Sequence, residues 1–179
     1  MKTMILFKSK YGSSRQYAAW IADALQCRVE DAGLVKLDEL LANDVIIYVG
    51  GIYAGGVNGY KSIQKHLGVL QHKKLILCMV GMADPAERGP YEEVFSRNVP
   101  EPYRNAVKPF ALRGDQLFSK MNPFHRLIMN VPKAAVKKIP EEQRTEGQKN
   151  LLKNFGKDIR FVKQDSISEV VAYAKKLSV

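Results

Sequence analysis

The sequence has few residues of the kinds that build metal sites and disulfide frameworks. Its two cysteines, Cys27 and Cys78, form no Cys-x-x-Cys pair and no ligand cluster with His66, His72 or His125. We therefore expect neither a metal site nor a disulfide, and we interpret both cysteines as small apolar residues in a reducing compartment. The sequence also lacks a nucleophile–base pair and paired carboxylates at a telling spacing, so no catalytic side chain is predicted.

Long apolar runs are missing too. No run approaches the ~20 apolar residues that a membrane-spanning helix needs. Lys8 and Lys10 follow too short an apolar stretch for a signal peptide. These absences predict a cytoplasmic protein. The chain has 179 residues, of which 46% are apolar, and this is enough for one well-buried domain over residues 1–179.

Acidic residues are scarce in the second half of the chain. Residues 1–96 contain 11 Lys and Arg against 10 Asp and Glu, whereas residues 97–179 contain 17 against 8. The net charge of +10 therefore lies almost entirely in the second half. A basic surface indicates an anionic partner, such as a lipid surface, a nucleic acid or an acidic small molecule. Because no aromatic-rich basic motif is visible, nucleic-acid binding is not expected.

What the sequence does contain is an alternation of strand and helix patterns, which is typical of a parallel sheet covered on both faces. Strands are predicted near residues 3–8, 28–30 or 34–36, 44–50, 74–81 and 107–113. Helices are predicted near residues 13–26, 59–70, 90–97 and 168–178. Ser166 and Glu169 form a capping-box pattern ahead of the last helix. In a doubly wound sheet, ligands bind outside the carboxyl ends of the strands, where the strand order reverses.

A turn rich in hydroxyls and glycine links the first predicted strand to the first predicted helix. It runs from Ser9 through Gly12 to Ser14. The backbone N–H groups of such a turn, its hydroxyls and the positive end of a helix dipole converge on one point, which is a site for a phosphate. Gly12 permits close approach because it has no Cβ. The alternative is an ordinary turn whose serines only cap the helix.

Two further loops follow the third and fourth predicted strands. Residues 50–56 contain four glycines beside Tyr53. Glycines permit positive φ angles and close packing of a flat ligand against main chain, and Tyr53 is the aromatic residue expected beside that ligand. The alternative is a flexible surface loop whose tyrosine packs on a neighbouring helix. Residues 81–84 (Gly-Met-Ala-Asp) are small enough to admit the other side of the ligand.

These three segments resemble flavodoxins. The first strand and its Ser-x-x-Gly-x-Ser turn are similar to the loop that holds the FMN phosphate, and residues 45–56 and 75–82 are similar to the strands and loops beside the flavin ring. The resemblance implies an α/β, three-layer α/β/α flavodoxin-like fold, with a five-stranded parallel sheet in the order 2-1-3-4-5 and FMN as cofactor. The implied cofactor-binding residues are Ser9, Lys10, Tyr11, Gly12, Ser13, Ser14, Gly51, Ile52, Tyr53, Ala54, Gly55, Gly81, Met82 and Ala83.

Within that superfamily the chain looks most like the menaquinone-dependent protoporphyrinogen IX dehydrogenases of bacteria. The opening residues 1–7, the tripeptide 111–113 and the basic, apolar run 124–129 are similar to that group. The resemblance implies an oxidoreductase in which FMN carries the chemistry, an anionic porphyrinogen is the substrate and a quinone is the acceptor. The candidates to bind substrate carboxylates are Arg88, Arg113 and Arg126. The alternative for each is an exposed or ion-paired arginine.

Residues 115–157 form an insertion where a five-stranded core would hold only its last strand and helix. Apolar residues recur there every three or four positions, with Lys and Arg between or just after them. A basic amphipathic helix of this kind rests on an anionic membrane or lines a pocket for an apolar acid. The alternative is that its apolar face is simply core. Pro123 and Pro132 are expected to break the run, and residues 158–162 are a candidate for the second half of a split last strand.

Three functional hypotheses follow. The first is an FMN-dependent oxidoreductase similar to protoporphyrinogen dehydrogenase, with the basic insertion in peripheral contact with the inner face of the membrane. The second is a flavodoxin-type electron carrier that binds FMN and docks on redox partner proteins, although such carriers are typically acidic and this chain is basic. The third, which has the least support, is a binding module without flavin that uses its basic face on nucleic acid.

Overall fold

The computed structural model describes residues 1–177, which divide into two compact units. The first consists of Met1–Gly114 together with the segment that begins at Val162, and the second is Asp115–Phe161. The second unit corresponds to the predicted insertion, and it ends at Phe161 rather than at residue 157. That the two units form a single domain stays a prediction.

A parallel sheet forms the centre of the first unit. Its five strands are β1 (Thr3–Lys8), β2 (Arg28–Asp31), β3 (Val45–Tyr53), β5 (Lys74–Gly81) and β6 (Val107–Arg113). They lie in the order β2-β1-β3-β5-β6, and each neighbouring pair is parallel. Counted along the chain, this is the order 2-1-3-4-5, so the predicted topology is confirmed. A short extra strand, β4 (Gly56–Val57), pairs antiparallel with the end of β3.

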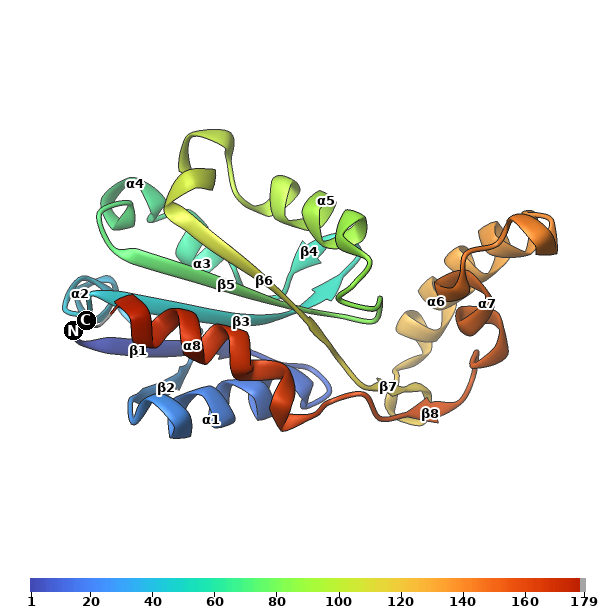
Figure 1. Cartoon of the computed structure of the whole chain (residues 1–179), viewed down its shortest axis with the longest axis horizontal. Helices are drawn as coiled ribbons and strands as arrows, with labels where there is room; N and C mark the ends of the chain where they lie inside the picture. Colours follow the sequence, from blue (N-terminus) through green and yellow to red (C-terminus); the bar gives the residue numbers. More distant parts are fainter. Residues whose placement is uncertain (178–179) are drawn as a thin grey trace. The chain divides into compact units, whose positions relative to one another are not determined.

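Helices cover both faces of this sheet, which gives the three-layer α/β/α flavodoxin-like fold (Figure 1). One face carries α1 (Ser13–Leu25) and α8 (Ser168–Leu177). The other face carries α3 (Lys61–Gln64), α4 (Leu67–Leu70) and α5 (Arg88–Asn98). The remaining elements of this unit are α2 (Leu37–Leu41) and the 3-10 turns Glu101–Ala106 and Gln164–Ile167.

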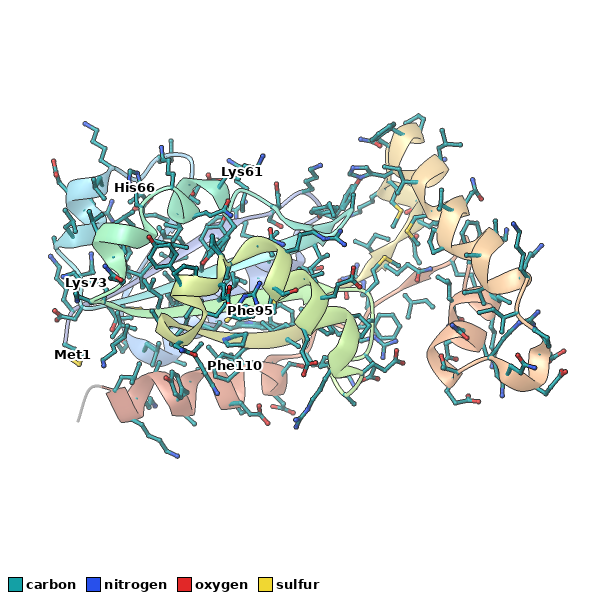
Figure 2. All side chains as sticks on the ribbon, turned by 90° about the horizontal axis from the view of Figure 1, so that it is seen from above. Met1, Lys61, His66, Lys73, Phe95 and Phe110 are labelled. Carbon is teal, nitrogen blue, oxygen red and sulfur yellow. The ribbon has the colours of Figure 1, made fainter. Side chains whose placement is uncertain are left out.

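The two faces of the sheet bury separate apolar clusters, because successive side chains of a strand point to opposite faces. Met4 and Leu6 of β1 belong to the cluster beneath α3, α4 and α5, whereas Ile5 belongs to the cluster beneath α1 and α8. Figure 2 labels Phe95, which packs on the first cluster, and Phe110, which packs on the second. Burial on both faces explains why β1, β3 and β5 are near-continuous apolar runs.

The structure departs from the predicted elements at three places. The helix expected over 59–70 is two short helices, because Lys65 and His66 interrupt it. Of the two candidate second strands, only residues 28–31 pair with β1. Ser166 lies inside the 3-10 turn that precedes α8, so the predicted cap is wrong, and the hydroxyl of Ser168 donates to the carbonyl oxygen of Asp165 at 2.7 Å. The predicted helix end at residue 178 lies outside the described residues.

Gly50 lies at a tight point near the carboxyl end of β3. A Cβ built there would lie 2.5 Å from Val57 Cγ1 and 2.9 Å from Tyr48 Cε1. We expect Gly50→Ala to destabilise the fold by about 1–3 kcal/mol, because buried neighbours resist added volume. Gly56→Ala is the matched control, since its Cβ would meet only the carbonyl oxygen of Tyr53 at 3.5 Å. Urea unfolding measures both variants, and equal midpoints would contradict the prediction.

The second unit is a pair of helices closed by a two-stranded ribbon. Its elements are β7 (Gln116–Leu117), α6 (Pro123–Lys137), α7 (Glu146–Lys153), β8 (Asp158–Ile159) and the 3-10 turns Phe118–Lys120 and Glu141–Gln143. β8 pairs antiparallel with β7, and the N–H of Ser119 donates to Asp158 Oδ1 at 2.8 Å. Within residues 158–162 only Asp158 and Ile159 form a strand, and it pairs with β7, so the prediction that these residues form the second half of the last sheet strand is wrong.

α6 also corrects a prediction, because it is one continuous helix of 15 residues that contains Pro132. Pro123 occupies the first turn, where its missing N–H needs no intrahelical acceptor. The side chain of Asn122 caps that turn by accepting from the N–H of His125 at 2.8 Å. Pro132 removes one hydrogen bond, yet Val136 in the following turn is buried and α6 packs against α7. Tertiary packing therefore holds the helix past Pro132.

Candidate functional site

Four strands of the sheet end at a common edge. Their register aligns Lys8 of β1 with Gly50 of β3, Gly50 with Met79 of β5, and Gly81 of β5 with Arg113 of β6. Every loop predicted to bind the cofactor therefore starts from this carboxyl edge, where doubly wound sheets bind their ligands. The first loop follows β1, the second is the end of β3, and the third follows β5.

The first loop ends in an open helix N-terminus. Gly12 is the N-cap of α1 with a φ of 103°, and its N–H donates to the Ser9 hydroxyl at 3.0 Å. The amides of Ser14 and Arg15 come before the first intrahelical hydrogen bond, which runs from the N–H of Gln16 to the Gly12 carbonyl at 2.9 Å. A Cβ on Gly12 would meet no atom within 4 Å. Open space therefore faces the positive end of a helix dipole, as a phosphate site requires.

The second loop is a tight hairpin rather than a flexible loop. Ile52 and Tyr53 pair with Val57 and Gly56, so that Ala54 and Gly55 are the two turn residues. Their φ angles are 49° and 78°, the two positive values that a type I′ turn needs. Gly55 meets this requirement without strain, whereas Ala54 is a non-glycine residue in the left-handed region. The hairpin holds Tyr53 at the edge of the sheet.

The side chain of Asn98 holds this hairpin from the end of α5. Its Oδ1 accepts from the N–H of Val57 at 2.9 Å, and its Nδ2 donates to the carbonyl of Gly55 at 2.9 Å and of Val94 at 2.7 Å. Sequence reasoning missed this residue. A lone asparagine at a helix end, more than forty positions from its partners, gives no sequence signal that it contacts the loop.

Tyr53 brings the first two loops together. Its ring lies edge-on to Tyr11, with ring centroids 6.3 Å apart, and Lys10 Nζ lies 4.7 Å from its centroid. The pKa of Tyr53 is raised to about 12, mainly by burial and to a smaller extent by the nearby Tyr11, while a hydrogen bond from the Lys10 backbone N–H opposes the shift. Tyr53 is therefore a neutral phenol at physiological pH, and an aromatic surface lies beside the candidate phosphate site.

The third loop is fixed by the chain around it. A Cβ on Gly81 would lie 3.0 Å from both Ile52 Cδ1 and the Tyr91 hydroxyl. That hydroxyl lies 2.9 Å from the carbonyl oxygen of Ala83, and burial raises its pKa. Gly81 thus lies between Tyr91 and Ile52 of the second loop, and Ala83 is held by Tyr91. A side chain at residue 81 would therefore press on both neighbours, and the absence of a Cβ lets the third loop pack this closely.

The three candidate substrate arginines lie in different surroundings. Arg113 ion-pairs with Asp84 at 3.1 Å in the third loop, and its carbonyl accepts from the Tyr17 hydroxyl at 2.8 Å. Arg88 is exposed at the start of α5, where it lines a hollow of about 640 Å³ alongside β6. Arg126 lies in the second unit and donates to the carbonyl of Ser119 at 2.9 Å. Arg113 is the one at the carboxyl edge, and a role in substrate binding stays a prediction for all three.

Residues 1–177 contain no group of three or more His, Cys, Asp and Glu side chains that could hold a metal ion. Cys78 is fully buried in β5, and burial raises the pKa of the half-buried Cys27 thiol. Over the same described residues, no helix is both long and apolar enough to cross a bilayer.

A family model described as a flavodoxin domain matches residues 4–163. Among solved structures, the chain is similar to a flavodoxin of Streptococcus pneumoniae TIGR4, at 19% identity over 63% of this chain and 82% of that one, with a TM-score of 0.44. It is also similar to two-electron reduced flavodoxin of Megasphaera elsdenii, at 12% identity over 86% and 98% of the chains (TM-score 0.47), and to oxidised Flavodoxin 2 of Bacillus cereus, at 15% identity over 95% and 99% (TM-score 0.45). A comparison with curated proteins gives no match.

Proposed function

The chain belongs to the flavodoxin-domain family, and we propose that it is an FMN-dependent oxidoreductase. The observation that carries the proposal is the meeting of two loops at the carboxyl edge of the sheet. One loop offers open space at a helix N-terminus beyond Gly12, and the other holds Tyr53 against Lys10 and Tyr11. A phosphate site with an aromatic side chain beside it fits the two ends of one FMN molecule.

The residues at the edge fit this cofactor. The amides of Ser14 and Arg15 and the hydroxyls of Ser9 and Ser13 are the groups that would bind the phosphate, and the Lys10 ammonium adds positive charge. Tyr53 would lie beside the ring on one side, and Gly81, Met82 and Ala83 would border the other. When bound, FMN supplies hydride and electron transfer. The protein would position the cofactor, because hydrogen bonds within the protein hold the second and third loops in place.

We further propose an anionic substrate of the porphyrinogen type and a quinone as acceptor. Support comes from the likeness of residues 111–113 and 124–129 to the protoporphyrinogen dehydrogenases, and from the basic second half of the chain. Arg113 is the best placed of the three arginines, because its ion pair with Asp84 holds the guanidinium beside the third loop. A substrate carboxylate would have to share that guanidinium with Asp84.

The test begins with an absorbance spectrum of the purified protein and titration with FMN. Stoichiometric flavin binding is expected, and its absence would overturn the proposal as a whole. The reduced protein is then mixed with a menaquinone analogue, and the oxidised protein with protoporphyrinogen. Turnover of both supports the enzyme. Flavin binding without turnover favours the second candidate, a flavodoxin-type electron carrier, and would overturn only the proposed substrates.

A further inference from the structure

α6 turns its apolar face away from the rest of its unit. Phe124, Leu127 and Val131 follow one another at helical spacing and are 66%, 66% and 70% exposed. Other positions of the helix pack inside the unit, where Val136 is 7% exposed and Lys133 Nζ lies 3.8 Å from the Phe155 ring centroid. The apolar row is therefore not the core of its own unit. A contiguous row of large exposed apolar side chains marks an interaction surface.

The sequence around this row is basic and contains no acidic residue. Residues 116–140 contain five Lys and Arg and no Asp or Glu. Lys120 lies before α6, and Lys137 and Lys138 lie at its C-terminal end, so positive charge stands at both ends of the apolar row. Over Asp115–Phe161 as a whole, ten Lys and Arg stand against five Asp and Glu, a balance of +5. The partner of the row therefore carries negative charge beside an apolar layer.

We propose that α6 docks in the interface of an anionic lipid leaflet, with Phe124, Leu127 and Val131 inserted among the lipids. The helix has 15 residues and is about 22 Å long, so it lies in the plane of the leaflet rather than crossing it. The lysines at its ends reach anionic headgroups while their methylene stems lie along apolar surface. The basic, acid-free sequence favours a leaflet over an apolar protein groove. The proposal does not depend on FMN binding.

Vesicle co-sedimentation of the full chain tests the proposal. The parent is mixed with phosphatidylcholine vesicles with and without phosphatidylglycerol, at low and high salt. A triple variant, Phe124→Ser with Leu127→Ser and Val131→Ser, removes the apolar row. The control, Leu34→Ser with Val69→Ser, removes two exposed apolar side chains of the other unit, which are 74% and 54% exposed. Since each buried apolar side chain is worth roughly tenfold in partition, the loss of three is expected to weaken binding about a thousandfold.

The expected result is binding to the anionic vesicles alone, weakened by salt, lost in the triple variant and kept in the control. A second readout is Phe124→Trp, whose added fluorescence should shift to the blue with anionic vesicles. Three outcomes would overturn the proposal: no vesicle binding by the parent, equal loss in the control, or a parent dimer that the triple variant dissociates without any vesicle binding. Circular dichroism and FMN titration of each variant separate these outcomes from misfolding and from failure of the redox proposal.

Discussion

Replacing Gly12 with leucine is expected to abolish FMN binding while the fold remains. The Cβ of residue 12 would point into space where no atom lies within 4 Å, so the leucine side chain starts out into open space. It would instead occupy the room that the phosphate needs at the N-terminus of α1. Because hydrogen bonds to a charged group are worth about 1.5–3 kcal/mol each, losing even two of them would weaken binding by a hundredfold or more. FMN titration measures this loss.

The strain of this substitution has to be separated from its effect on the site. Gly12 has a φ of 103°, and a residue with a Cβ pays about 1–2 kcal/mol there. Gly156→Leu is the matched control, because Gly156 has a φ of 84°, also has no atom within 4 Å of a built Cβ, and lies in the other unit. Both variants should lose similar stability in urea unfolding. Undiminished FMN affinity in Gly12→Leu, or equal loss in Gly156→Leu, would refute the phosphate loop.

Much of this site could be predicted because its signals are local. The turn from Ser9 to Ser14 joins an apolar strand to a helix within a few residues, and parallel strands bring such turns to one edge. The four glycines of residues 50–56 predicted positive φ angles, and Gly55 has one. The role of Gly50 in the same segment could not be predicted. A Cβ on Gly50 would collide with Val57 and Tyr48, so this glycine is required by packing within the protein.

What could not be predicted depends on contacts between distant residues. Pro132 is a helix breaker by its own chemistry, yet the packing of α6 on α7 keeps the helix continuous. The sequence predicts a strand at Asp158 and Ile159, but this strand pairs with β7. The pattern of a strand does not show which other strand it pairs with. Asn98 and Tyr91 hold two of the three site loops by side-chain hydrogen bonds across the fold. Such residues are found only when the chain is seen folded.

Asn98→Ala is expected to weaken FMN binding about tenfold through the hairpin that carries Tyr53. The substitution removes the acceptor of the Val57 N–H and the donor to the Gly55 carbonyl. Losing these bonds costs about 1–3 kcal/mol. The loss destabilises the turn formed by Ala54 and Gly55, whose left-handed backbone depends on support from its surroundings. Asn98→Asp keeps an acceptor for Val57 and places an oxygen toward the Gly55 carbonyl. It should therefore also weaken binding, by repulsion at the turn.

Asn43→Ala distinguishes a role in the site from a role in stability. Asn43 is buried, and its Nδ2 donates to the carbonyl of Glu39 at 2.7 Å, near the amino end of β3 and away from the hairpin. Its loss should lower the unfolding midpoint about as much as Asn98→Ala and leave FMN affinity unchanged. FMN titration is made at a temperature where circular dichroism shows every variant fully folded. Equal affinities in Asn98→Ala and Asn43→Ala would mean that Asn98 only stabilises the fold. A selective loss in Asn98→Ala would mean that a residue outside every cofactor loop sets the geometry of the flavin site.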